Sequence, residues 1–426
     1  MRTEKRPRFY GWYIAGCCLV VFFFTNGLSL YVPQNLFPRF METFGATPAE
    51  VSRTTAISFA LAGLIAPFVG ALIDRLGVVR VIRTGLIVLA LTFSAYPFAQ
   101  SLQHLYVLHA AIAVGLVFAG LMPNVVLLSN WFITRRGTVV GLLVAGSSLA
   151  GAILPVSIAP LVNDPAQGWR VGFGVLAAAF WLCAVLPGFL VLRESPRVVG
   201  QFPDGAAVAP PGSNDGEELR EGVPFATALR SRTLWCLALG SASIWFSIQA
   251  ITSQFTIYLE QDAGLQPLQA TRLYSTLLAC SVAGKFLFGA ISDRFTKRSM
   301  MLVASSVLLL GCLQLFSLEN GVLGLAHAPA RLMAFAIVFG LGFGGSFTLI
   351  QLVAVESFGQ LALGRILGVI IFIDTMGGAL GTLLAGQIRT TTGDYFQSFS
   401  VVTVVAIIAV INVLMIPTVQ RSGSER

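Results

Sequence analysis

The chain has 426 residues, of which 56% are hydrophobic and only 11% are charged. A soluble globular domain carries about 25% charged residues, so this chain cannot cover a water-facing surface of its own. The net charge of +8 is not concentrated in basic stretches interleaved with aromatic residues, so we predict no nucleic-acid partner. The composition indicates an integral membrane protein in contact with lipid.

Apolar stretches of membrane-spanning length recur along the whole chain. A helix needs about 20 mostly apolar residues to cross a bilayer. In chain order, we expect twelve spans at 12–36, 52–73, 81–99, 105–129, 138–162, 171–192, 234–259, 271–291, 300–317, 332–353, 365–387 and 396–416. The predicted fold class is therefore an all-α polytopic membrane protein with twelve transmembrane helices.

The distribution of Lys and Arg residues predicts the orientation of these spans. With both termini placed on the cytoplasmic side, the cytoplasmic segments hold 20 of the 27 basic residues and the outer segments hold six. Cytoplasmic loops of membrane proteins carry such an excess of positive charge. We therefore predict cytoplasmic termini, and the short loops favour a bacterial inner membrane.

A motif at the end of the second predicted span returns after the eighth. The stretch GALIDRL begins at Gly70, and GAISDRF begins at Gly289. An internal repeat of about half the chain predicts two pseudo-symmetric halves of six helices each. We expect an N-terminal bundle at 1–193 and a C-terminal bundle at 234–426.

Residues 194–233, between the two bundles, are predicted to form a cytoplasmic linker and an interfacial segment. Residues 194–224 are rich in Pro, Gly and acidic residues and show no hydrophobic period. Such a composition buries too little apolar surface to become ordered by itself. We expect a flexible linker, followed by a segment at 225–235 that lies along the membrane surface.

Several of these motifs resemble those of a known family. The stretch GALIDRLG at 70–77 resembles the loop-two signature of the major facilitator superfamily, and GAISDR at 289–294 resembles its second copy. The stretches FYGW at 9–12, NWFITRRG at 130–137 and GKFLFGAISDR at 284–294 resemble the monocarboxylate transporter family and its bacterial oxalate/formate-type relatives. The resemblance implies the major facilitator fold and transport by alternating access, and we expect a functional monomer.

The sequence departs from the monocarboxylate transporter pattern at three positions. The family typically has an arginine where this chain has Lys285, and some members have an acidic residue in place of Ser281. Many members have a lysine after the proline of the first span, where Gln34 follows Pro33 here. Two of these three departures remove a charge from the membrane interior.

The resemblance also implies a cytoplasmic gate. In the family's fold, helix eleven starts near the first motif and helix five near the second, so Arg365 is expected near Asp74, and Arg136 near Asp293. A carboxylate near a helix N-terminus is stabilised by about 0.3–1 kcal/mol when exposed. We predict that these contacts latch the two halves; the alternative is that the same residues only anchor the loops. The predicted gate comprises Gly70, Asp74, Arg75, Arg136, Gly289, Asp293, Arg294 and Arg365.

Two charged residues, Lys285 and Asp374, lie well inside the predicted spans. A charge in the membrane interior costs at least about 2.5–3.5 kcal/mol, so a functional role is the first hypothesis. Lys285 is about 12 Å along its helix from Asp293, and Asp374 is about 15 Å beyond Gly364, so both are expected near the midplane. Lys285 is interpreted as the counter-charge for an anionic substrate and Asp374 as the proton acceptor. The alternatives are a permanent salt bridge between the two, or a lysine that reaches the cytoplasmic surface.

Neutral polar residues complete the predicted substrate site. The resemblance implies that spans one, four, seven and ten line the transport cavity. Hydrogen bonding between helices explains each of these side chains equally well. The predicted contacts, besides Lys285, are Asn26, Gln34, Asn124, Ser247, Gln254 and Gln351.

These residues predict a secondary active transporter that carries a small organic monoanion, such as lactate or pyruvate, together with a proton. A single lysine partly neutralised by one acid suits a monoanion. The alternative is a proton-driven exporter of drugs or other hydrophobic compounds, because Gly146, Gly151 and Pro155 resemble a glycine-and-proline antiporter helix. No catalytic motif and no metal-ligand spacing occurs in the sequence, so we predict no enzymatic activity, no metal and no cofactor.

Overall fold

The computed structural model describes residues 9–164, 168–206, 222–319, 328–359 and 361–417. Twelve helical segments in this part of the chain are long and apolar enough to cross a membrane, which confirms the predicted fold class. The helices of the N-terminal half are α1 (Gly11–Asn26), α2 (Val32–Asn35), α3 (Phe37–Phe44), α4 (Pro48–Leu76), α5 (Val78–Ala95), α6 (Leu102–Ala119), α7 (Leu121–Trp131), α8 (Arg136–Val162), α9 (Gly168–Phe180) and α10 (Leu186–Leu190). Those of the C-terminal half are α11 (Phe225–Leu229), α12 (Arg232–Gln261), α13 (Pro267–Ile291), α14 (Lys297–Glu319), α15 (Pro329–Phe358), α16 (Leu363–Thr392) and α17 (Phe396–Leu414).

Several membrane spans are composites of shorter helical pieces. A π-helical turn at Gly27–Tyr31 joins α1 to α2, and another at Trp181–Val185 joins α9 to α10. Other helices are longer than their apolar stretches. In α4, for example, Thr47 and Glu50 form a reciprocal capping box that starts the helix before the apolar stretch begins. A capping box satisfies backbone N–H groups that the first helical turn leaves free.

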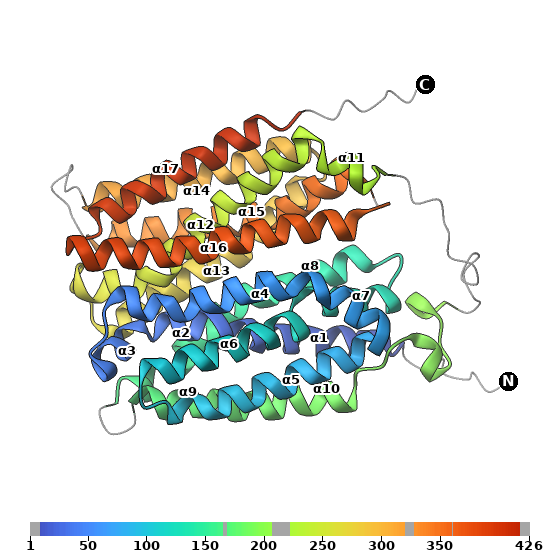
Figure 1. Ribbon diagram of the computed structural model, residues 1–426, viewed down its shortest axis with the longest axis horizontal. Helices are drawn as coiled ribbons and strands as arrows, with labels where there is room; N and C mark the ends of the chain where they lie inside the picture. Colours follow the sequence, from blue (N-terminus) through green and yellow to red (C-terminus); the bar gives the residue numbers. More distant parts are fainter. Residues whose placement is uncertain (1–8, 165–167, 207–221, 320–327, 360, 418–426) are drawn as a thin grey trace.

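The two halves lie side by side, with their long helices running along the same direction (Figure 1). They contact each other mainly through α4 against α16 and α8 against α13. The chain alternates between two ends of this bundle. We call the end at which α1, α8, α12 and α16 begin the linker end (right in Figure 1), and the opposite end the far end.

We call the contacts α4–α16 and α8–α13 the two seams. The halves touch along them only from the far end to the middle of the bundle. On the first seam, a Cβ atom on Gly386 would lie 2.5 Å from Ser52 Oγ, and one on Gly63 would lie 2.7 Å from Met376 Cε. Toward the linker end, a Cβ atom on Gly364 or Gly368 would have no neighbour within 4 Å. The helices of the two halves therefore diverge toward the linker end.

The beginning of the linker is attached to the N-terminal half. The Glu194 carboxylate accepts hydrogen bonds from the backbone N–H groups of Val78 (2.7 Å) and Val79 (3.1 Å), where α5 begins. Asp204 Oδ2 accepts from the backbone N–H groups of Ile133 (2.9 Å) and Thr134 (2.8 Å). Burial acts to raise the pKa of Asp204, but the backbone hydrogen bonds outweigh it and hold that pKa below its usual value.

Residues 194–206 therefore differ from the flexible linker expected from composition, because the side chains of Glu194 and Asp204 accept hydrogen bonds from backbone N–H groups of the bundle. They include two short 3₁₀ helices, Pro196–Val199 and Pro203–Gly205. Residues 207–221 of the predicted linker lie outside the described residues. After them, the backbone N–H of Val223 donates to the carbonyl of Phe358 at 2.9 Å, and α11 packs against α12 and α16.

Candidate functional site

Lys285 lies at the interface between the two halves. Its side chain is 6% exposed, and its Nζ donates a hydrogen bond of 3.0 Å to the main-chain carbonyl of Val144 on α8. The ammonium group also lies 4.6 Å from the centre of the Phe347 ring on α15. This is a cation–π contact, which adds to the stabilisation of a desolvated cation.

Close packing of α13 against α15 fixes the position of this lysine. A Cβ atom on Gly284 would lie 2.4 Å from the Leu341 carbonyl oxygen, and one on Gly344 would lie 2.0 Å from the carbonyl of Ser281. Small residues let membrane helices approach each other this closely. Lys285 and Phe347 therefore sit on two helices whose backbones are in direct contact.

The hydrogen bond of Lys285 is the last inter-half bond along the seam between α8 and α13. Nearer the far end, Ser275 Oγ donates to the Gly151 carbonyl at 3.5 Å, and Ser148 and Ser281 share a hydrogen bond of 3.0 Å. Nearer the linker end, a Cβ atom on Gly141 would have no neighbour within 4 Å. Lys285 thus lies at the level where the halves separate.

Asp374 lies at a similar level on the other seam. Its side chain is 8% exposed, and Oδ2 accepts a hydrogen bond of 3.1 Å from Ser241 Oγ on α12. Its Oδ1 lies 3.4 Å from the hydroxyl of Thr375, which borders the contact between Met376 and Gly63. The two interior charges therefore lie on different helices of the C-terminal half and have different contact residues.

Lys285 and Asp374 do not form an ion pair. The ion pairs among the described residues join Arg39 to Glu42 and Glu260, Lys297 to Asp293, and Arg389 to Asp262. The contact of Lys285 with Val144 also keeps its ammonium away from the linker-end surface. Neither alternative arrangement expected for this lysine occurs in the conformation described.

Two of the predicted substrate contacts instead join the halves to each other. Gln34 Nε2 donates to Gln249 Oε1 at 2.9 Å, and Gln34 Oε1 accepts from the Tyr274 hydroxyl at 3.1 Å. Gln254 Nε2 donates to Ser52 Oγ at 2.7 Å. In this conformation these amides close the bundle on the far-end side of Lys285.

The other neutral candidates are not brought together with Lys285 by any hydrogen bond. Asn26 Nδ2 donates to the Phe22 carbonyl at 3.2 Å, and Asn124 Nδ2 donates to the carbonyls of Ala119 and Gly120. Ser247 Oγ donates to the Ser243 carbonyl one turn earlier, and Gln351 is half-buried on α15. Their roles in binding stay predictions.

The predicted gate residues lie at the linker end without the predicted contacts between halves. Gly70 and Gly289 are half-buried, whereas Asp74, Arg75, Arg136, Asp293, Arg294 and Arg365 are exposed. Asp293 pairs with Lys297 of its own half at 3.2 Å. Among the described residues, no ion pair joins Asp74 to Arg365 or Asp293 to Arg136.

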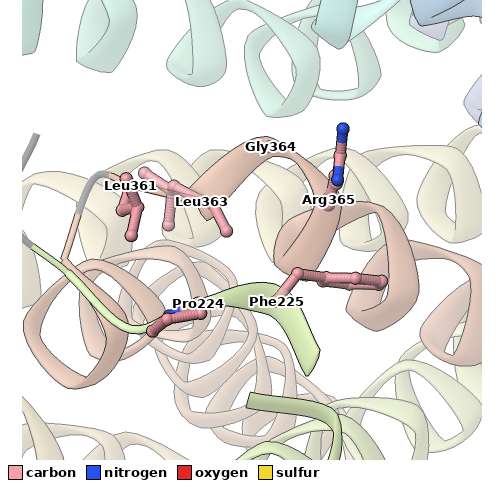
Figure 2. A pocket seen from close by; sticks show the side chains of 7 residues that line it. Pro224, Phe225, Leu361, Leu363, Gly364 and Arg365 are labelled. Carbon is pink, nitrogen blue, oxygen red and sulfur yellow. The ribbon is translucent and has the colours of Figure 1, made fainter. Parts of the chain in front are cut away.

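Arg365 borders a cavity of about 460 Å³ at the start of α16, which is also lined by Pro224, Phe225 and residues 361–364. Figure 2 shows its guanidinium pointing away from Phe225, toward the helices of the other half. The residues that line this cavity include neither Lys285 nor Asp374.

Close packing accounts for the glycines of α8 that resemble an antiporter helix. A Cβ atom on Gly146 would lie 2.6 Å from the Leu19 side chain, and one on Gly151 would lie 2.3 Å from the Leu278 side chain. Sequence reasoning missed Gln249, Tyr274 and Ser241, which bond to predicted residues. Each is a polar residue in an apolar span, and that was the available signal.

Comparisons with known proteins agree with this architecture. A model of the Major Facilitator Superfamily matches residues 17–382 and, in a second overlapping match, residues 275–425. The chain is 24% identical over 417 residues to an uncharacterised MFS-type transporter of Bacillus subtilis, YcxA, covering 95% of this chain and 94% of that protein.

The chain is also similar in sequence to animal monocarboxylate transporters, over nearly as much of its length. The chain is 28% identical to monocarboxylate transporter 13 of Rattus norvegicus, covering 94% of this chain and 87% of that protein. It is 27% identical to monocarboxylate transporter 11 of Homo sapiens, covering 92% and 79%. The resemblance predicted from the motifs is confirmed by these matches.

A solved structure shares the fold. The crystal structure of a bacterial homologue of the human lysosomal transporter Spinster, in an inward-facing and occupied conformation, superposes with a TM-score of 0.74. The two sequences are 16% identical, and the match covers 96% of this chain and 97% of that one. The described chain is thus an integral membrane protein with two halves of six helices.

Proposed function

Because the chain belongs to the Major Facilitator Superfamily, we propose that it is a secondary active transporter that moves a small organic monoanion together with a proton. The observation that carries this proposal is the separation of two buried charges, Lys285 and Asp374, which lie at the level where the halves diverge and form no ion pair. Transporters of this type bind their substrates near the midplane between two halves.

Lys285 supplies the charge that an anion needs. An ammonium group has three N–H donors. Among the described residues, the Lys285 ammonium donates one hydrogen bond, to the Val144 carbonyl, which carries no negative charge. A substrate carboxylate would neutralise the cation and accept its remaining donors through charge-assisted hydrogen bonds. The similarity to proteins named monocarboxylate transporters supports this chemistry.

Asp374 supplies the proton site. Its carboxylate accepts from Ser241 and lies beside the Thr375 hydroxyl, but among the described ion pairs it has no cationic partner. A buried carboxylate without a cation is readily neutralised by a proton. Binding of one anion at Lys285 and one proton at Asp374 leaves the net charge of the interior unchanged, so the proposed symport is electroneutral.

The contacts between the halves define the conformation. The seams are closed from the far end to Lys285 and open toward the linker end. With the linker end in the cytoplasm, as the distribution of basic residues predicts, this is the inward-facing state. In the outward-facing state, the proposed latch pairs Asp74 with Arg365 and Asp293 with Arg136.

Replacement of the lysine tests the anion site. We expect Lys285→Ala to abolish uptake of labelled lactate or pyruvate into proteoliposomes under an imposed pH gradient, because the substrate then lacks its counter-charge. Arg272→Ala, at an exposed position of the same helix, is the matched control and should transport normally. Normal uptake by Lys285→Ala would contradict the proposal.

Replacement of the acid tests the proton site separately. We expect Asp374→Asn to lose accumulation driven by a pH gradient, because the amide cannot take up a proton. Exchange of labelled for unlabelled substrate across the membrane should continue, since Lys285 is intact. A variant that still accumulates substrate against its gradient would remove Asp374 from the coupling mechanism.

A further inference from the structure

A series of aromatic side chains starts at Lys285 and crosses the molecule. The Phe347 ring, 4.6 Å from the Lys285 ammonium, lies 5.6 Å from the ring of Trp245 on α12. Trp245 in turn lies 6.3 Å from Phe343 and 6.3 Å from Phe59 on α4, all as ring-centre distances. We call Phe347, Trp245, Phe343 and Phe59 the aromatic row; it contains residues of both halves.

The aromatic row leads from the proposed anion site to the proposed proton site. On α12, Trp245 follows Ser241, the donor to Asp374, by four residues, which is about one helical turn. At the other end of the row, a Cβ atom on Gly378 would lie 3.4 Å from Phe59, and Gly378 follows Asp374 by about one turn. A molecule that contacts Phe347 and Trp245 would therefore have Lys285 at one end and lie about one helical turn from Ser241, the donor to Asp374.

Three members of the aromatic row keep part of their surface free. Phe59, Trp245 and Phe347 are half-buried. By contrast, a second aromatic cluster on the same helices α12 and α15, formed by Phe255, Phe335 and Phe339, is at most 1% exposed. Core packing accounts fully for that second cluster but leaves the free faces of the row without a partner.

The indole of Trp245 also keeps an unused donor. The Nε1–H groups of Trp131, Trp169, Trp181 and Trp235 each donate a hydrogen bond. None of the hydrogen bonds between described residues involves the indole of Trp245. Because Trp245 is half-buried, its N–H group is accessible to a ligand that has an acceptor beyond its carboxylate.

We propose that the preferred substrate is an aromatic monocarboxylate whose carboxylate binds Lys285 and whose ring packs against Phe347 and Trp245. This inference rests on the proposed function and narrows its substrate class. Aromatic rings prefer tilted or edge-to-face contacts of the kind that the row already shows.

A matched pair of substrates tests the inference. Phenylpyruvate and pyruvate share the same keto acid group and differ by a phenyl ring. In wild-type proteoliposomes under an inward proton gradient, we expect phenylpyruvate to inhibit uptake of labelled pyruvate with a half-inhibitory concentration at least about ten-fold below that of unlabelled pyruvate. Cyclohexylpyruvate, which is equally apolar but not aromatic, should inhibit more weakly than phenylpyruvate.

Variants of the aromatic row show which residues produce the preference for phenylpyruvate over pyruvate. Trp245→Leu should bring the half-inhibitory concentrations of phenylpyruvate and pyruvate within about two-fold of each other, and Trp245→Phe should restore most of the preference. Trp235→Leu, on the same helix but 45% exposed on the outside of the bundle, is the matched control and should keep the full preference.

The outcomes separate this inference from the proposed function. If phenylpyruvate and pyruvate inhibit equally in the wild type and uptake still requires Lys285, the substrate is not preferentially aromatic. The proposed monoanion site is then still supported. The proposed function itself is contradicted if Lys285→Ala takes up both acids, or if the wild type transports neither. Because the substrate comparison is made on the wild-type protein, a poorly folded variant does not prevent the test.

Discussion

The far end and the linker end of the bundle are built from the same helices, but they differ in how the halves meet. At the far end, Arg39 pairs with Glu260, Gln34 bonds to Gln249, and the Ala49 N–H donates to Thr390 Oγ1 at 3.0 Å. At the linker end, among the described residues, Asp74 and Arg365 are exposed and share no ion pair.

This difference shows that the two ends use different chemistry to close. The far end is held by neutral amides and hydroxyls in buried positions and by one partly buried ion pair. The linker end presents exposed charges at helix ends, whose interactions water and salt weaken. A transporter must close one end as it opens the other, so changes at the two ends should shift the same equilibrium in opposite directions.

The largest expected effect comes from the glycines of α16. A Cβ atom on Gly386 would lie 2.8 Å from the Pro48 carbonyl, whereas one on Gly368 would meet no atom within 4 Å. Overpacking costs about 1–3 kcal/mol, so Gly386→Ala should disfavour the closed far end. We expect spin labels on cysteines at positions 138 and 296 to come closer in this variant, as the linker end closes.

The control for that prediction is Gly368→Ala, which should leave the distribution of label distances unchanged. It adds the same methyl group to the same helix at the open end of the seam. If both alanine variants behave alike, the contrast in packing between the two ends has no bearing on the conformational equilibrium.

A comparable effect is expected from the far-end amide of Gln34. Gln34→Leu removes its hydrogen bonds to Gln249 and Tyr274, and each bond contributes about 0.5–1.5 kcal/mol. Double electron–electron resonance should show a longer distance between spin labels at positions 103 and 261, because the far end opens. Gln387→Leu, at an exposed position of α16, should show no change, and a Gln34→Leu distribution identical to wild type would count against the amide as a closing contact.

The smallest effect is expected at the linker end. Asp74 is exposed and unpaired in the conformation described, so Asp74→Asn should leave this state unaffected and weaken only the closed linker end, by up to about 1 kcal/mol. The labels at positions 138 and 296 should then move farther apart on average. Glu356→Gln, another exposed acid near this end, serves as control; an unchanged distance distribution for Asp74→Asn would argue against the latch.

The sequence was sufficient to predict the helices and the two interior charges. Apolar stretches of about 20 residues have few alternatives to membrane-spanning helices, and a charge such as Lys285 or Asp374 is conspicuous within such a stretch. The repeated motif at Gly70 and Gly289 likewise predicted the two halves, which the match to the superfamily supports.

The partners of those residues were not predictable from the sequence. Lys285 bonds to a main-chain carbonyl, which every residue has and which therefore leaves no mark in the sequence. Gln34 was assigned to the substrate because it is polar within a span, but its partners Gln249 and Tyr274 lie on helices of the other half, and the sequence does not show which helices pack together. Residues 194–206 of the predicted linker differ from the expectation based on composition for a similar reason, because Glu194 and Asp204 accept hydrogen bonds from backbone N–H groups of distant loops.

The contact between Lys285 and Val144 determines which substitutions leave the hydrogen bond of the lysine intact. The acceptor is an oxygen of the peptide backbone, so it survives any replacement of the side chain at position 144 that keeps α8 helical. A substitution of the Val144 side chain therefore leaves the hydrogen-bond acceptor of Lys285 in place. The anchoring of the proposed anion site depends on the path of the α8 backbone and not on the identity of residue 144.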